Sequence, residues 1–100
     1  MRKGSLAFYV YMLASQRNGT LYIGITSNIC LRMEQHRKGV GSAFVKKYGV
    51  NKLVYFEEFR LYTDAIRRET SLKRWKRAWK IALIEKHNPQ WVDLLERWNG

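Results

Sequence analysis

Residues 9–36, YVYMLASQRNGTLYIGITSNICLRMEQH, decide the predicted fold of this chain, because they have the pattern of two strands followed by a short helix. The strand-like runs cover residues 8–13 and 21–25, and the turn between them ends in Asn18-Gly19. An Asn-Gly pair between two such runs favours a chain reversal. We therefore predict two antiparallel strands that lie side by side.

Three tyrosines of this hairpin are expected on one face. Successive residues of a strand point to opposite faces, so Tyr9 and Tyr11 point one way while Val10 and Met12 point the other. Tyr22, in the partner strand, can share the face of Tyr11. The hairpin is therefore predicted to present three phenol groups on the same side of a sheet.

A short helix is predicted directly after the hairpin. Ser27 or Asn28 can cap its first amide groups, and Gly39 ends it. Arg32 and His36 are four residues apart, so they share one face of this helix, beside its apolar edge. A guanidinium and an imidazole are therefore expected at the border of the sheet.

The composition favours a globular protein that binds a polyanion. One hundred residues are enough for one compact domain, 1–100, but too few for two separate cores. Nineteen Lys and Arg against eight Asp and Glu give a formal net charge of +11, which favours phosphate binding through counterion release. Nucleic acid is the first candidate. An anionic membrane is the disfavoured alternative, since the aromatic residues are spread through strand-like and helical segments.

The remaining compositional signals concern the cellular compartment. Cys30 is the single cysteine, which excludes an intrachain disulfide or a zinc site built from several cysteines. The basic N-terminal residues lead into a strand-like segment and do not have the pattern of a signal peptide. No apolar run approaches the length of a membrane span. We expect a bacterial cytoplasmic protein.

The middle of the chain predicts a short helix, a third strand and a longer helix. Residues 43–49 form the first helix, which ends at its glycine, and residues 53–59 form the strand. Glu57 and Glu58 near the end of this strand point to opposite faces, and we expect them to be exposed. The longer helix is predicted to begin near Thr63, whose hydroxyl can cap it.

Glu69 interrupts the inward stripe of this longer helix, which otherwise contains Ala65, Ile66 and Leu72. Burying a lone carboxylate is costly unless a cation or hydrogen-bond donors compensate. The residues alone leave two alternatives open, an ion pair with Arg32 or another base, and a metal ligand.

The last third of the chain predicts further helix. Trp75 and Trp79 continue the apolar stripe, and their spacing favours core packing over base stacking. The pattern leaves open whether one helix or two, with a break at residues 74–76, covers this region. Asn88 is predicted to cap a final helix that starts at Pro89. Its apolar face would consist of Trp91, Leu94, Leu95 and Trp98.

Tyr9-Val10-Tyr11 is followed after ten residues by Tyr22-Ile23-Gly24, and Arg32 lies eight positions further on. With this pattern the sequence resembles the GIY-YIG nuclease superfamily, and the resemblance to its small stand-alone bacterial members, the excision-repair-nuclease-like proteins, covers the whole chain. Tyr9 stands where the family has glycine, whereas Tyr11 is the tyrosine that the family uses. The predicted fold is α/β (α+β), a central three-stranded antiparallel sheet flanked by helices, as in that superfamily.

The resemblance implies a metal-dependent endonuclease that hydrolyses phosphodiester bonds of nucleic acid, DNA more than RNA, in DNA repair or processing. Glu69 matches the family's metal-binding glutamate and would hold one divalent ion, Mg²⁺ or Mn²⁺. Tyr11 would be the general base, and Tyr22, Arg32 and His36 would bind or orient phosphate and water. The residues expected to contact nucleic acid are Gly24, Arg32, Lys46, Lys47, Arg68, Lys73, Arg74 and Lys76.

Other interpretations remain beside this one. The same scaffold could bind nucleic acid without turnover, although a pure binder has no need for Glu69 among so many bases. A structural adaptor for an acidic protein would also leave Glu69 unexplained. Asn88 matches a late asparagine near the active site of many superfamily members only loosely, and its role as a helix cap explains it fully.

Overall fold

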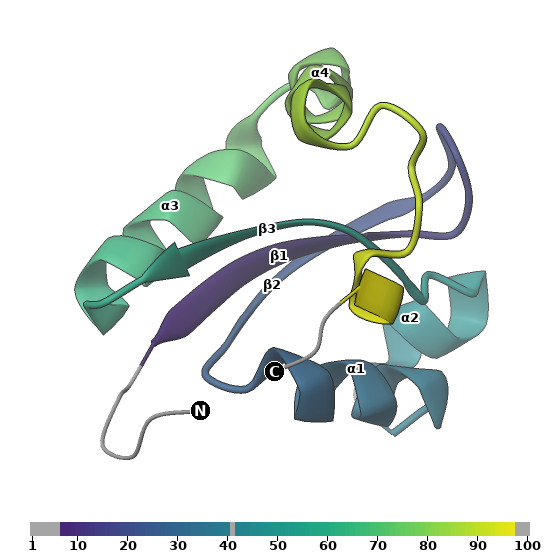
Figure 1. Cartoon of the computed structure of the whole chain (residues 1–100), viewed down its shortest axis with the longest axis horizontal. Coiled ribbons are helices and arrows are strands. Elements are labelled where there is room, and N and C mark those ends of the chain that lie inside the picture. Colours follow the sequence, from purple (N-terminus) through teal and green to yellow (C-terminus); the bar gives the residue numbers. More distant parts are fainter. Residues whose placement is uncertain (1–6, 41, 98–100) are drawn as a thin grey trace.

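A three-stranded antiparallel sheet forms the centre of the computed structural model, which describes residues 7–40 and 42–97. Its strands are β1 (Phe8–Ala14), β2 (Leu21–Thr26) and β3 (Lys52–Phe59), in the spatial order β2-β1-β3. β1 therefore pairs with both neighbours, as Figure 1 shows. The predicted hairpin and the predicted third strand are confirmed.

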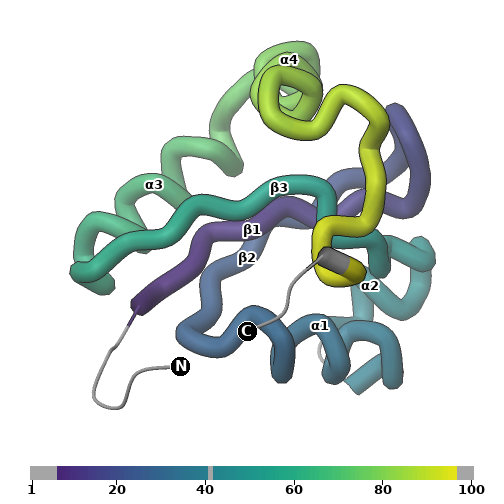
Figure 2. The backbone as a smooth tube through the Cα atoms, in the orientation of Figure 1, coloured from purple at the N-terminus to yellow at the C-terminus, as the bar shows by residue number. Residues whose placement is uncertain are grey.

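Helices cover both faces of this sheet (Figures 1 and 2). On one face lie α3 (Tyr62–Arg74) and α4 (Arg77–His87), and on the other lie α1 (Ile29–Arg37), α2 (Ala43–Tyr48) and the 3₁₀ helix η1 (Leu94–Arg97). Within the described residues no helix has the length and apolar character needed to cross a membrane.

The central position of β1 explains its apolar sequence. Alternate residues enter two different cores, so Val10 and Met12 pack under α3 and α4, while Tyr11 and Leu13 pack against α1 and α2. All four side chains are fully buried. A strand covered on both faces needs apolar residues at every position, and this need explains why the pattern of β1 does not alternate with polar residues.

Local capping signals define the two short helices. The side chain of Asn28 accepts a hydrogen bond from the Leu31 amide at 3.0 Å, and Gly39 follows α1 with a φ of 76°. Ser42 caps α2, which ends at Gly49 with a φ of 63°. Left-handed backbone of this kind favours glycine, so these helix ends agree with the sequence predictions.

The start of α3 and the packing of α4 differ from the predictions. α3 begins one residue earlier, with Leu61 at its N-cap and no side-chain cap, so the predicted cap at Thr63 is wrong. Ile66, assigned to the inward stripe, is 38% exposed. The chain breaks between α3 and α4 at extended residues Trp75 and Lys76, which turns Trp79 outward. Trp79 is 54% exposed, so its predicted core position is wrong.

The C-terminal segment also differs from the predicted helix. Asn88 ends α4 instead of starting a helix, and its buried amide donates to the carbonyl oxygens of Val54 and Val92 at 3.1 and 2.9 Å. Trp91, with a φ of 55°, is buried against the α3/α4 face. These tertiary contacts hold the chain in an irregular path until η1. Trp98 lies outside the described residues.

Glu57 is not the exposed strand end that the sequence predicted. Its carboxylate accepts two hydrogen bonds from Arg68, Nε at 2.9 Å and Nη2 at 2.8 Å, and a third from the Tyr55 hydroxyl. Burial raises the pKa of Glu57, but the bonds from Arg68 and Tyr55 outweigh it and hold that pKa below its usual value. The ion pair ties α3 to β3.

Removal of this carboxylate is expected to destabilise the fold. Glu57→Ala should lower the free energy of unfolding by about 2 kcal/mol at pH 7, since it leaves Arg68 unpaired in a partly buried position. Because the pKa of Glu57 is lower in the folded chain, its contribution is complete above the ordinary carboxyl pKa and disappears as the pH falls through the folded value. Urea unfolding at pH 7 and pH 3 should therefore show a difference between wild type and variant that shrinks in acid.

The matched control for this prediction is the exposed pair of Glu34 and Lys38 on α1. Glu34→Ala should change the free energy of unfolding by less than about 0.5 kcal/mol at either pH. Equal effects of the two substitutions would show that the Glu57 pair does not connect α3 to β3 energetically.

Candidate active site

Tyr11, Arg32 and His36 form a hydrogen-bonded cluster between β1 and α1. The Tyr11 hydroxyl lies 3.0 Å from His36 Nε2. Arg32 Nη1 donates to the Tyr11 oxygen and to the carbonyl of Ile25, both at 3.5 Å. Tyr22 closes the cluster, with its ring centroid 5.6 Å from that of His36. The structure thus brings four of the five predicted catalytic side chains together.

The sheet register explains how the tyrosines meet. Tyr11 lies opposite Gly24 and Leu13 lies opposite Tyr22, so the two tyrosines are diagonal neighbours on one face. The Tyr11 ring occupies the space above Gly24, where an added Cβ would lie 2.5 Å from the Tyr11 oxygen. Gly24 was predicted to contact nucleic acid, and the structure shows that its missing side chain makes room for the phenol of Tyr11.

α1 contributes the guanidinium of Arg32 and the imidazole of His36. Asn28 fixes the start of this helix, and Ile29 and Met33 are buried against the sheet. Arg32 and His36 then lie one turn apart and face the hairpin, as predicted. His36 is only 3% exposed, so it is not a surface histidine at the helix edge.

Burial sets the protonation states of the cluster. Burial raises the pKa of Tyr11 to about 12, assisted by the charges of Tyr22 and Glu69 and opposed by Arg32. Burial also lowers the pKa of His36, and the positive charge of Arg32 lowers it further. Both groups are therefore neutral at pH 7, and the arrangement favours a phenol that donates its proton to Nε2.

His36 has one further feature. Among the described residues its Nδ1 atom is the buried side-chain nitrogen or oxygen for which no hydrogen-bond partner occurs. Buried polar atoms are almost always paired in folded proteins, with protein groups or with water. The second ring nitrogen of His36 is therefore an exception to this rule, while its Nε2 atom contacts Tyr11.

Glu69 lies on α3, which covers the opposite face of the sheet from α1. Its side chain is only 13% exposed, and its partner is Lys73, one turn further along, at 3.2 Å. The negative charge of Glu69 contributes to the raised pKa of Tyr11, so the two groups lie within electrostatic range. The base that compensates Glu69 is thus Lys73. Because Lys73 is 54% exposed, this pair contributes little stability and can open.

The donor set around Glu69 fits magnesium better than zinc. In the described part of the chain, no group of three or more His, Cys, Asp and Glu side chains could enclose a metal ion. Mg²⁺ commonly uses one or two carboxylates and keeps waters that phosphate oxygens can replace. The single, largely buried carboxylate of Glu69 is compatible with that type of site.

The predicted basic contacts are divided between two regions. Lys46 and Lys47 lie on α2, and Lys73 and Arg74 lie at the end of α3, and all four are exposed. Lys76 follows them, with its ammonium 5.5 Å from the Trp79 ring centroid. Arg68 differs, because Glu57 neutralises its guanidinium and the ring of Trp75 lies 5.1 Å away. It does not belong to the free basic surface.

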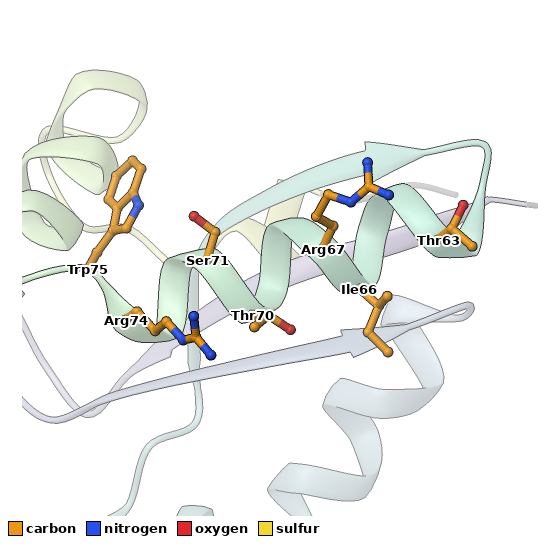
Figure 3. Close-up of a pocket in the computed structure, with 7 residues that line it drawn as sticks. All are labelled: Thr63, Ile66, Arg67, Thr70, Ser71, Arg74 and Trp75. Atoms are coloured by element: carbon orange, nitrogen blue, oxygen red, sulfur yellow. The ribbon is translucent and has the colours of Figure 1, made fainter.

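A hollow of about 680 Å³ lies on the outer side of α3 (Figure 3). Its lining consists of Thr63, Ile66, Arg67, Thr70, Ser71, Arg74 and Trp75. It contains none of the clustered residues Tyr11, Tyr22, Arg32 and His36. The hollow and the hydrogen-bonded cluster are therefore separate features of the structure.

An aromatic extension of the cluster was not predicted from the sequence. The ring of Phe44 lies 6.0 Å from that of Tyr22, and the ring of Tyr48 lies 4.8 Å from that of Phe44. The i, i+4 spacing of Phe44 and Tyr48 could have shown that they share a face of α2. Their approach to Tyr22 depends on how α2 packs, which no local pattern reveals.

A family model described as the GIY-YIG catalytic domain matches residues 7–82. This range includes the cluster and Glu69. Two bacterial relatives are each called a UPF0213 protein. The relative from Pediococcus pentosaceus is 39% identical over 80 residues, which are 80% of this chain and 83% of that protein. The relative from Clostridium perfringens is 38% identical over 76 residues, which are 76% of this chain and 81% of that protein.

A solved structure has the same architecture. The solution NMR structure of the UPF0213 protein from Bacillus halodurans superposes with a TM-score of 0.55 at 26% identity. The match covers 90% of this chain and 95% of that one. The predicted fold, a three-stranded antiparallel sheet with flanking helices, is thereby confirmed.

Proposed function

Because this chain belongs to the GIY-YIG catalytic-domain family, we propose that it is a metal-dependent endonuclease that hydrolyses phosphodiester bonds of nucleic acid, DNA in preference to RNA. The observation that carries the proposal is the contact of the Tyr11 hydroxyl with both His36 and Arg32. A proton acceptor and a cation at one oxygen are what attack of water on a phosphate diester requires. The net charge of +11 supports a polyanionic substrate.

Arg32 would neutralise the phosphate. Its guanidinium has several donors, two of which already point to oxygen atoms of Tyr11 and Ile25 at 3.5 Å, the long end of a hydrogen bond. Such weak contacts can be exchanged for the non-bridging oxygens of a phosphate, which a planar guanidinium binds in a fork. Tyr22, beside His36, would help to position the same group.

Tyr11 and His36 would remove the proton of the attacking water together. A phenol whose pKa is raised to about 12 is a poor base alone, because its oxygen is protonated at neutral pH. The hydrogen bond to Nε2 solves this problem, since Tyr11 can take a proton from water as its own proton passes to His36. The charge of a bound phosphate would offset Arg32, which otherwise lowers the pKa of His36.

Glu69 would hold the divalent ion. When bound, Mg²⁺ or Mn²⁺ would supply Lewis-acid stabilisation of charge on the phosphate oxygens and on the leaving oxygen. The largely buried carboxylate of Glu69 and its weak pair with the exposed Lys73 support this role. Lys73 would be released to contact phosphate nearby.

A non-catalytic nucleic-acid-binding module is the second candidate. One observation favours it: Tyr11 and Glu69 are already paired, with His36 and Lys73 respectively. The two candidates differ in turnover and not in binding, so affinity alone does not separate them.

The test is cleavage of end-labelled single-stranded, duplex and branched DNA, and of RNA, with Mg²⁺, Mn²⁺ or a chelator. The proposal requires strand scission with a divalent ion and intact strands with the chelator. Binding to these substrates without scission in either metal would favour the non-catalytic module.

A further inference from the structure

An exposed row of rings leads away from the cluster along α2. This aromatic row consists of Tyr22, Phe44 and Tyr48, with successive centroid distances of 6.0 and 4.8 Å. Phe44 is 38% exposed and Tyr48 is 48% exposed. Tyr22 at the inner end also contacts His36, so the row begins at the candidate active site.

The core includes contacts of Tyr22 but does not require the two outer rings of this row, Phe44 and Tyr48. Val45 is the α2 residue that is buried, and it anchors the helix in the core with Met33 and Leu53. The α2 helix is held by its Ser42 cap and by Gly49. Two large rings on the open side of a six-residue helix therefore expose apolar area that packing does not explain.

Positive charge accompanies the row. Lys46 and Lys47 are exposed on the same helix, and Lys47 Nζ lies 5.4 Å from the Tyr48 ring centroid. Consecutive rings with adjacent cations are the combination by which proteins bind single-stranded nucleic acid, because bases stack on the rings and phosphates pair with the cations. A base inside a duplex is stacked on its neighbours and presents no free face to such a row.

We infer that the aromatic row is a stacking subsite for unpaired bases next to the scissile phosphate, so that the substrate is single-stranded where it crosses α2. This inference rests on the proposed function and adds the substrate class to it. Its occupant is nucleic acid rather than an apolar protein surface. The row begins at the cluster that contains Arg32, the proposed phosphate-binding residue, and lysines flank it.

The test uses binding and not cleavage. Fluorescence anisotropy in chelator should give the Kd of wild type, Phe44→Leu and Tyr48→Leu for a labelled single-stranded oligonucleotide and for a blunt duplex of the same sequence. Leucine keeps an apolar helix-forming side chain and removes the ring. Each substitution should weaken single-strand binding about 10-fold and duplex binding less than about 2-fold.

The matched control is Tyr62→Leu, because Tyr62 is 50% exposed at the start of α3 and outside the row. It should leave both Kd values unchanged. Phe44→Trp keeps a ring and should retain wild-type affinity. If Phe44→Leu does not fold, Tyr48→Leu, at the more exposed end, gives the decisive comparison. Unchanged single-strand affinity in a folded row variant, or equal losses for single strand and duplex, would overturn the inference.

The outcomes also separate this inference from the proposed function. If the row variants selectively lose single-strand binding and the wild type cuts no substrate, the stacking subsite is supported and the nuclease proposal is contradicted. If wild type and row variants cut duplex as fast as single strand, at equal rates, the nuclease proposal is supported and the stacking subsite is contradicted.

Discussion

Glu69→Gln is expected to lower the single-turnover cleavage rate by about 100-fold or more, because it removes the carboxylate proposed to hold the divalent ion. Glutamine has nearly the same shape, so the packing of α3 is preserved. Loss of the pair with Lys73 should affect folding little, because Lys73 is 54% exposed. The measurement is the cleavage rate at saturating enzyme across a magnesium titration, with thermal unfolding recorded beside it.

The control for Glu69 is Glu34→Gln. Both glutamates pair with a lysine one turn away in a helix, but Glu34 is on the outer side of α1 and its side chain is 59% exposed. Its substitution should leave the rate unchanged. A Glu69→Gln protein that cuts at the wild-type rate would show that Glu69 is only the ion-pair partner of Lys73.

Tyr11→Phe is expected to lower the cleavage rate by about 100- to 1,000-fold with little change in nucleic-acid Kd. The substitution keeps the buried ring and removes the oxygen that contacts Arg32 and His36. It should also lower the free energy of unfolding by about 1–2 kcal/mol, since His36 Nε2 loses its buried partner. Single-turnover rates and Kd values from the same preparations separate chemistry from binding.

The pH dependence of wild-type cleavage checks the same step. Proton transfer from Tyr11 requires neutral His36, whose pKa is lowered by burial and by Arg32. The rate should therefore rise with pH through a limb that lies below the usual imidazole range, and then stay level through neutral pH. A limb at alkaline pH, towards the raised Tyr11 pKa of about 12, would instead identify a phenolate as the base. Equal rates for wild type and Tyr11→Phe would remove Tyr11 from the chemistry.

Local signals in the sequence predicted the part of the fold that local interactions determine. Asn28 and Gly39 bound α1 because capping depends on residues a few positions apart. The i, i+4 spacing of Arg32 and His36 placed both on one helix face for the same reason. The proximity of Arg32 and His36 to Tyr11 was predicted from the alternation of residues along the strands and from the family resemblance.

The errors arose where distant contacts override local preference. Asn88 has the pattern of a helix cap, but its buried amide binds the β3 backbone at Val54 and holds the following chain away from helix. Glu57 pairs with Arg68, eleven residues away on another element, so no strand pattern could show that it is partly buried. Trp79 has helical spacing with Trp75, but the break before α4 turns it outward.

The candidate site shows the same division. Glu69 was singled out as a carboxylate on an apolar face, and its partner Lys73 is one helical turn away, so that pair was within reach of sequence reasoning. The burial of His36 and the approach of Phe44 to Tyr22 depend on tertiary packing and were not. The role of Gly24 in making room for Tyr11 likewise required the strand register.

The most direct measurement of the central claim records binding and scission of one end-labelled single-stranded DNA in the same reactions, for wild type, Tyr11→Phe, Glu69→Gln and Glu34→Gln. We predict that all four bind with similar Kd, and that wild type and Glu34→Gln cut the strand in magnesium and not in chelator. Tyr11→Phe and Glu69→Gln should leave the strand intact over the time in which wild type cuts it. Tight binding by wild type without scission in either Mg²⁺ or Mn²⁺, or scission at equal rates by all four, would contradict a catalytic centre built from Tyr11, Arg32, His36 and Glu69.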